Sequence, residues 1–410
     1  MLCSLLAVSA MTIAENLPDV ADLAARAAKA YRIGRVAEAR SLYESALSQH
    51  TRFAPALAGL GRIELIEHRR KSAVQRLAIA YQIAPGDPEI VRDFAAATDD
   101  KTLEAILLQR LLNLPATSAH DREVAQIKLP IHRKVAGRAT NVLLSGHRPY
   151  RMRMPLVFSR DWRPYGWAIA VRVNDEATLR LLVDTGACGI LLFRKKGLGL
   201  EPLADSSIGG FGDGSRQVAQ TMLANRVLVD GQLELGNVIV EAVDRQLVEG
   251  VDGLISPDVF GQFLVTIDGP KKMLELTPFA DSAESAPLLE GFQSLRRLGH
   301  LWMVERRAGE QFVLDTGSSY TVIHEPVPSL HAETISLYGV SGEARLARVS
   351  IPVEVSLGGT KTWTRDAVSA DLEPISQQFG MRISGFLGFR AVRRLRMSLD
   401  SRNNSIRIQR

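Results

Sequence analysis

One short segment occurs twice in this 410-residue chain. The first copy is Leu181-Leu182-Val183-Asp184-Thr185-Gly186-Ala187, and the second, 131 residues further on, is Phe312-Val313-Leu314-Asp315-Thr316-Gly317-Ser318. An Asp-Thr-Gly tripeptide alone is a weak signal, because ordinary composition produces it by chance in about one chain of this length in ten. The apolar run before each copy makes the signal specific, because such a run predicts a buried strand that ends at the aspartate.

The sequence in front of each tripeptide predicts a β-hairpin. Residues 167–173 and 178–183 alternate with period two around a turn at Asn174-Asp175, and they lead directly into the first copy. Residues 301–305 and 311–314 do the same for the second copy. Both tripeptides are therefore expected at the same place in the same kind of hairpin.

The duplication continues downstream of the tripeptides. Gly253-Leu254-Ile255-Ser256 follows Asp184 at almost the same distance at which Gly385-Phe386-Leu387-Gly388 follows Asp315. Each motif is followed by a short amphipathic stretch and final strands. We therefore assign two copies of one β unit, the first lobe at 155–280 and the second at 281–410.

This arrangement resembles the pepsin and retropepsin class of aspartic proteases, and its local sequence is closer to bacterial retropepsin-like proteins than to pepsins. The resemblance covers residues 155–410. It implies an all-β bilobal fold with a pseudo-two-fold axis and an active site between the lobes. Because both Asp-Thr-Gly loops lie in one chain, it also implies an active site that is complete in a monomer.

Peptide hydrolysis of this type needs a water molecule held between two carboxyl groups. Two adjacent carboxylates cannot both ionise, so the pair holds one proton at working pH. One carboxylate is then the general base for the water, and its protonated partner donates to the carbonyl oxygen. We assign these catalytic roles to Asp184 and Asp315 without deciding which residue is the base.

Five further residues are expected to support the active-site loops. Gly186 and Gly317 permit a tight turn that points backbone N–H groups at the carboxylates. By resemblance, Thr185 and Thr316 hydrogen-bond across the lobe interface. Ser318 carries a hydroxyl that can donate to Asp315, whereas Ala187 offers Asp184 nothing. We therefore expect Asp184 to be the more readily protonated aspartate and the pH optimum to exceed that of a strongly acid protease.

Each lobe also contains a candidate hairpin that overhangs the cleft, at 208–216 and at 337–345. A flap over substrate and a plain surface turn are both compatible with these segments. The candidate substrate contacts are Gly210, Phe211, Gly212, Tyr338 and Gly339.

Residues 20–114 are expected to form α-helical hairpins that resemble tetratricopeptide repeats. Small and large residues recur with a period of 34, as in the pair Ala39 and Ala73 and the pair Tyr43 and Leu77. An unrelated helical bundle is the alternative. A repeat module of this kind binds a peptide or protein partner and carries no chemistry.

The net charge of +5 is concentrated in one stretch rather than spread over a face. We interpret residues 115–154 as a basic linker, with contact to an anionic membrane surface as the alternative. A nucleic-acid partner is not expected, because aromatic residues are not interleaved with the basic ones. An inhibitory segment folded over the cleft is a further alternative for this stretch.

Residues 1–14 are apolar and uncharged, and they resemble a secretory leader that lacks its basic start. This predicts export, to the periplasm or the cell exterior, and otherwise a cytoplasmic protein. The chain has two cysteines and no metal-ligand or nucleotide-binding motif, so no metal or cofactor is expected.

The sequence as a whole predicts a multidomain α plus β protein that acts as an aspartic endopeptidase, its protein substrate recruited by the helical module. The alternative is a protease-like scaffold that binds peptides without cutting them. Ser256 weakly favours this alternative, because glycine is expected at that position and is present as Gly388 in the second lobe.

Overall fold

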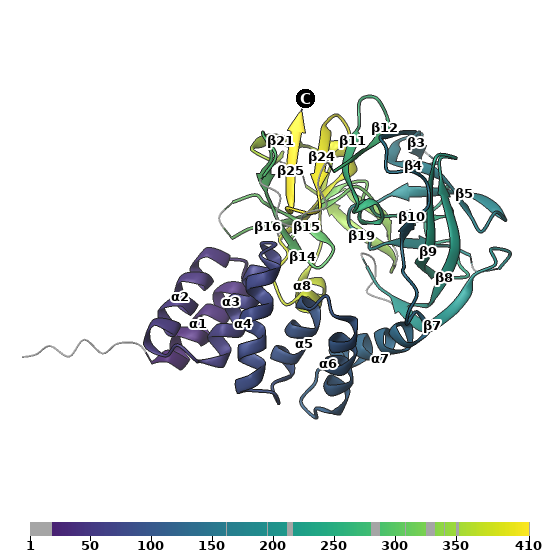
Figure 1. The fold of residues 1–410 in the computed structure, drawn as a ribbon. Helices are drawn as coiled ribbons and strands as arrows, with labels where there is room; N and C mark the ends of the chain where they lie inside the picture. Colours follow the sequence, from purple (N-terminus) through teal and green to yellow (C-terminus); the bar gives the residue numbers. More distant parts are fainter. Residues whose placement is uncertain are drawn as a thin grey trace, which may run out of the picture.

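The computed structural model describes residues 19–409 except 161, 195, 211–215, 280–287, 308, 325–332, 340 and 350–351. It has an N-terminal helical region and a large C-terminal β-rich region built from several sheets (Figure 1). The expected leader, residues 1–14, lies outside the described part. Within that part, no helix combines the length and the apolar character needed to cross a membrane.

The helices recur at a fixed interval. The first pair begins at Val20 and Val36 and the second at Ala54 and Arg70, so that both pairs repeat with the expected period of 34. The helices are α1 (Val20–Arg32), α2 (Val36–Gln49), α3 (Ala54–Ile66), α4 (Arg70–Ile83), α5 (Pro88–Ala97), α6 (Lys101–Asn113) and α7 (Ala119–Lys134).

Capping and small residues explain why these helices start and pack as they do. The carboxylates of Asp87 and Asp100 accept hydrogen bonds from the first-turn N–H groups of α5 and α6. Helices α3 and α4 approach closely at Gly61, where an added Cβ would lie 2.7 Å from Leu77 Cγ. The expected pairing of a small residue with a large one is present at this crossing.

The first β unit is a sheet in which the strand before Asp184 is central. Strand β5 pairs antiparallel with β4 and parallel with β10, and Leu181 lies opposite Gly253. Asn174 and Asp175 both have positive φ, as the tight turn between β4 and β5 requires. The strands are β1 (Val142–Leu143), β3 (Leu156–Phe158), β4 (Pro164–Val173), β5 (Ala177–Val183), β6 (Ile190–Leu192), β7 (Glu201–Ile208), β8 (Gln217–Val229), β9 (Leu233–Ala242) and β10 (Gly253–Ile255).

The second β unit repeats this core. Strand β16, which ends at Asp315, pairs antiparallel with β15 and parallel with β23, and Phe312 lies opposite Gly385. The elements are β14 (Arg296–Leu298), β15 (Leu301–Glu305), β16 (Gln311–Asp315), β17 (Thr321–Ile323), β18 (Thr334–Gly339), β19 (Gly342–Arg348), β20 (Val353–Leu357), β21 (Thr360–Thr364), β22 (Ala367–Ser369), α8 (Glu373–Phe379), β23 (Gly385–Gly388) and α9 (Phe389–Val392).

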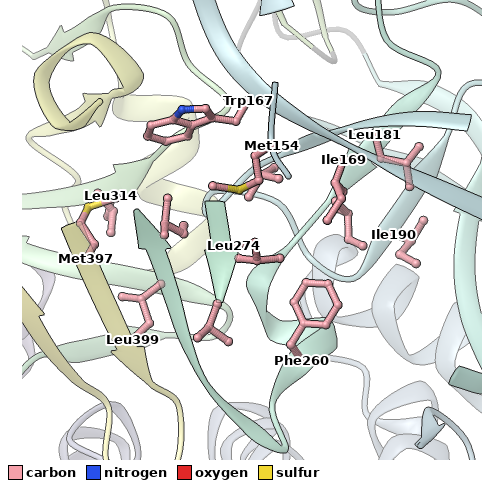
Figure 2. Packing of buried hydrophobic residues seen from close by; sticks show 14 of the residues in the cluster. Met154, Trp167, Ile169, Leu181, Ile190, Phe260, Leu274, Leu314, Met397 and Leu399 are labelled. Carbon is pink, nitrogen blue, oxygen red and sulfur yellow. The ribbon is translucent and has the colours of Figure 1, made fainter. Parts of the chain in front are cut away.

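A further sheet joins the two units. Strands β11 and β24, one from each unit, pair antiparallel, and the hydroxyls of Thr266 and Ser398 are hydrogen-bonded at 2.8 Å in this pairing. The strands of the sheet are β2 (Tyr150–Arg153), β11 (Phe263–Asp268), β12 (Met273–Pro278), β13 (Gln293–Ser294), β24 (Arg396–Asp400) and β25 (Ser405–Gln409). Figure 2 shows the core that continues through the junction, with Trp167 and Leu181 from the first unit and Leu314 and Met397 from the second.

Residues 115–154, expected to be a linker, contribute to both neighbouring regions. Helix α7 extends the helical array, β1 pairs with β9, and β2 pairs with β12. Part of the basic charge is used in internal ion pairs, such as Arg138 with Glu201 at 2.8 Å. The local sequence did not indicate this, because the partners lie far along the chain.

The helical array is packed against the second β unit. Tyr31 and Val36 belong to the same buried cluster as Leu301 and Val313. The Gln311 side chain also donates to the Gly34 carbonyl at 3.3 Å. From this contact the array runs along one side of the β region to α7, which lies beside β7 (Figure 1).

Candidate active site

The two predicted catalytic carboxyls lie together at the junction of the β units. Asp184 directly follows β5 and Asp315 is the last residue of β16, and Asp184 is only 8% exposed. The backbone N–H of Gly186 donates to Asp184 at 2.8 Å, and that of Gly317 donates to Asp315 at 3.0 Å. Each glycine also faces the carboxyl of the other unit, since an added Cβ at Gly317 would lie 2.3 Å from Asp184.

Burial raises the pKa of both carboxyls above the ordinary range. The pKa of Asp315 is raised well above its usual value by burial and, in addition, by the charge of Asp184. Burial also raises the pKa of Asp184, but backbone N–H groups of Gly186, Ala187 and Gly317 oppose the rise. Because two adjacent carboxylates cannot both ionise, the pair shares one proton, and the two groups titrate as a unit.

The Ser318 hydroxyl does not make the contact on which the expected order of protonation rested, so that order stays a prediction. The Ser318 hydroxyl donates to the Tyr320 carbonyl at 2.8 Å instead of to Asp315, which receives the Ser318 backbone N–H at 3.0 Å. Ala187 is not inert, because its backbone N–H stabilises the Asp184 carboxylate. Backbone N–H groups, which side-chain identity does not reveal, therefore stabilise the ionised form of both carboxyls.

A pH titration of stability is expected to reveal the buried pair. A raised carboxyl pKa stabilises the fold fully below the unfolded value of about 3.9, and that stability is lost as pH rises through the folded pKa. The free energy of unfolding of the wild type should therefore fall as pH rises above about 3.9, and that of Asp315→Asn should fall less. Chemical denaturation at a series of pH values measures this difference, and parallel curves for the two proteins would contradict it.

Thr185 and Thr316 hold the two loops together through reciprocal hydrogen bonds. The Thr185 hydroxyl donates to the Leu314 carbonyl at 2.7 Å and accepts the Thr316 backbone N–H at 3.0 Å. The Thr316 hydroxyl donates to the Val183 carbonyl at 2.8 Å and accepts the Thr185 backbone N–H at 3.1 Å. Both threonines are buried, so these bonds are shielded from water.

Thr185→Val should destabilise the fold without changing the volume of the site. The substitution leaves the Thr316 N–H and the Leu314 carbonyl without their partner, and a buried unpaired group costs about 1–3 kcal/mol. We expect a loss of about 2 kcal/mol in the free energy of unfolding, measured by denaturant titration. Thr360→Val, at the half-buried first residue of β21, is the control, and equal losses in the two variants would argue against the proposed importance of the contact.

Two hairpins meet over the carboxyls. One is β7–β8 of the first unit and the other is β18–β19 of the second. The Gly210 N–H donates to the Ser341 hydroxyl at 2.9 Å, so the two hairpins touch near their tips. Both line a cleft of about 410 Å³ that also contains Asp184 and Asp315.

The structure places some of the predicted substrate contacts in this cleft. Gly210 and Gly339 line it. Tyr338 lies opposite Glu343 in the β18–β19 pairing, and its side chain is outside the described part. Phe211 and Gly212 fall within residues 211–215, which are not described, so their predicted roles stay predictions.

The sequence reasoning missed His300. Its Nε2 lies 3.2 Å from the Gly186 carbonyl, and the side chain lines the cleft beside the first active-site loop. Burial lowers the pKa of His300, which favours a neutral ring that donates to this carbonyl. No local motif marks the residue, because the contact joins different β units.

The structure also explains why serine is tolerated at position 256. In the second unit, a Cβ at Gly388 would lie 2.2 Å from the Tyr320 carbonyl oxygen. The residue equivalent to Tyr320 in the duplication is Gly189, which has a φ of 62°. This left-handed backbone makes room for buried Ser256, whose N–H donates to the Gly189 carbonyl at 2.8 Å. The serine at position 256 is therefore accommodated by the local backbone and does not by itself favour a non-catalytic scaffold.

No protein-family model and no curated protein matches this sequence. Among solved structures, the chain is similar to the crystal structure of an aspartic proteinase from Irpex lacteus. The identity is 14% and the TM-score is 0.38, over 63% of this chain and 96% of that one. The similarity is too low to support an argument about function, which therefore depends on the geometry above. Within the described residues, no group of three or more potential metal ligands comes together.

Proposed function

We propose that the protein is an aspartic endopeptidase. The observation that carries the proposal is the pair of buried, proton-sharing carboxyls of Asp184 and Asp315 beneath two touching hairpins. Within this pair, the ionised carboxylate is the general base that removes a proton from water. Its protonated partner donates a proton to the carbonyl oxygen of the scissile peptide bond.

An extended peptide fits the cleft better than a small metabolite does. Gly210 and Gly339 of the two hairpins line the cleft, and an extended chain can add to the edge of a hairpin through backbone hydrogen bonds. Its side chains would then alternate between the hairpin side and the carboxyl side of the cleft.

We further propose that the substrate continues into a second cavity. This cavity, of about 910 Å³, lies between the helical array and the second β unit. It shares the residues Gln378 and Phe379, at the end of α8, with the catalytic cleft. A chain that leaves the cleft across α8 would therefore meet the tetratricopeptide-like helices, as expected for a module that recruits substrate.

The walls of the second cavity suit a polar polypeptide segment. Arg62 and Arg92 share the buried carboxylate of Asp93, and Arg92 also lies 3.7 Å from Asp121. Because both signs of charge line the cavity, we propose recognition of a mixed polar sequence rather than a purely acidic one. Export through residues 1–14, and membrane contact through the exposed basic residues of 115–154, remain proposals.

A peptide library of graded lengths tests this function. The purified protein is incubated with the library from about pH 3 to about pH 8, with and without a pepstatin-like inhibitor. Inhibitor-sensitive cleavage, faster for long members than for short ones, is the expected result. Binding of peptides without cleavage at any pH would instead favour the non-catalytic scaffold.

A further inference from the structure

Helix α7 contacts the hairpin of the first unit at both its tip and its base. At the tip, Glu123 Oε1 accepts a hydrogen bond from the Ser207 hydroxyl at 2.6 Å and from Arg216 Nη2 at 3.1 Å. Ser207 lies near the end of β7 and Arg216 immediately precedes β8, so this one carboxylate joins the two strands. Toward the base, the Lys134 ammonium donates to the Pro202 carbonyl at 2.9 Å.

The same helix is fixed to the rest of the array. Ala125 and Leu129 of α7 are buried in the cluster that holds α3 to α6 together. The other end of the array shares a core with the second β unit, through residues such as Tyr31 and Val313. A continuous path of packed elements therefore runs from the second unit, through the helices, to the hairpin of the first unit.

The first turn of α7 also lines the second cavity. Ser118 and Asp121 belong to its wall, and Glu123 follows them on the same helix. A chain in that cavity would contact the helix that holds the hairpin over Asp184 and Asp315.

From these contacts we infer that Glu123 is a positioning residue for the catalytic cleft: through Ser207 and Arg216 it holds the β7–β8 hairpin over the substrate. The inference rests on the proposed peptidase function, and Glu123 itself touches neither the substrate nor the reacting carboxyls. Its side chain is 38% exposed and that of Arg216 is 41% exposed, so the link is moderate in strength and can be broken without unfolding the protein.

Steady-state kinetics of Glu123→Ala are the first test. A hairpin that is held less firmly should weaken the binding of the substrate and of the transition state by similar amounts. An equal loss of both raises KM and leaves kcat nearly unchanged. We expect KM to rise about 3- to 10-fold and kcat to stay within about twofold. Glu123→Gln, which retains an acceptor for Ser207, should recover part of the loss.

A mutant cycle tests both partners. If Glu123 acts through Ser207 and Arg216, then Glu123→Ala should have little further effect on KM in a protein that already carries Ser207→Ala and Arg216→Ala. An undiminished effect of Glu123→Ala in that protein would overturn the inference. Lys128→Ala is the matched control, because Lys128 lies on the same helix and pairs with Glu104 inside the array at 3.3 Å. Its KM should equal that of the wild type.

Hydrogen exchange tests the same link without relying on cleavage. In the Asp184→Asn background, Glu123→Ala should speed exchange of the β7 and β8 amides near Ile208 and Gly210 by about 3- to 10-fold, as expected for a more weakly held element. Amides of β4 and β5 should not change, nor should any amide of this hairpin in Lys128→Ala. Unchanged exchange of the hairpin amides would refute the inference, even if the wild-type protein is an active peptidase. Faster exchange, together with a wild-type protein that cleaves no peptide, would refute only the peptidase function.

Discussion

Asparagine in place of Asp184 or of Asp315 is expected to lower kcat/KM for peptide hydrolysis by about 10³-fold or more. Either substitution removes one member of a pair in which one group must accept a proton and the other must donate one. Because the Asn side chain has almost the same shape, it retains an oxygen that can accept the N–H of Gly186 or Gly317. The loss should therefore be one of chemistry rather than of substrate binding, with KM little changed.

The stability of these variants separates catalysis from misfolding. Each removes a carboxyl whose burial raises its pKa, so each should be at least as stable as the wild type at neutral pH. Asp371→Asn, which removes an exposed carboxylate, is the control and should keep full activity. A variant of Asp184 or Asp315 that remains stable and still cleaves at the wild-type rate would exclude the proposed mechanism.

Gly388→Ser is expected to destabilise the protein by about 3 kcal/mol or more, which is at the upper end of the range for overpacking a buried site. The new Cβ would lie 2.2 Å from the Tyr320 carbonyl oxygen and 2.4 Å from its carbon, and both atoms are backbone. Since a backbone strand cannot rotate away as a side chain can, relief requires that β17 and β23 separate. That movement would also disturb the loop that carries Asp315.

The reciprocal substitution Ser256→Gly should cost only about 1 kcal/mol, chiefly through the greater freedom of glycine in the unfolded chain. Both variants exchange the same two residue types at equivalent positions of the duplicated units, so each controls for the other. Denaturant titrations of the two proteins measure the asymmetry. Similar losses in both variants would show that the left-handed backbone at Gly189 does not provide the space for Ser256.

Local patterns in the sequence predicted much of the β region. Strands β5 and β16, and the turn at Asn174-Asp175, lie where the alternation of apolar residues placed them. The parallel pairings of Leu181 with Gly253 and of Phe312 with Gly385 agree with the duplication. These features were predictable because strand period and turn chemistry depend on residues that are close in the sequence.

The stretch 115–154 shows where such reasoning failed. Its charge and its lack of a long apolar pattern suggested a linker, whereas α7 packs on the helical array and β2 adds to the sheet that joins the two units. The short strands β1 and β2 are held by partners such as β9 and β12 that are more than 90 residues away in sequence. A segment stabilised by distant partners carries too little local signal to be recognised.

The sequence by itself determined the two equivalent aspartates, the duplicated hairpins that present them and the 34-residue spacing of the helices. Only the tertiary structure decided how the groups around them interact: the Ser318 hydroxyl donates to the Tyr320 carbonyl rather than to Asp315, His300 supports the first loop, and Glu123 reaches the hairpin. The physical reason is the range of the interactions. Periodicity and turns are local properties of the chain, whereas proton affinity, burial and contacts between units depend on which distant surfaces pack against one another.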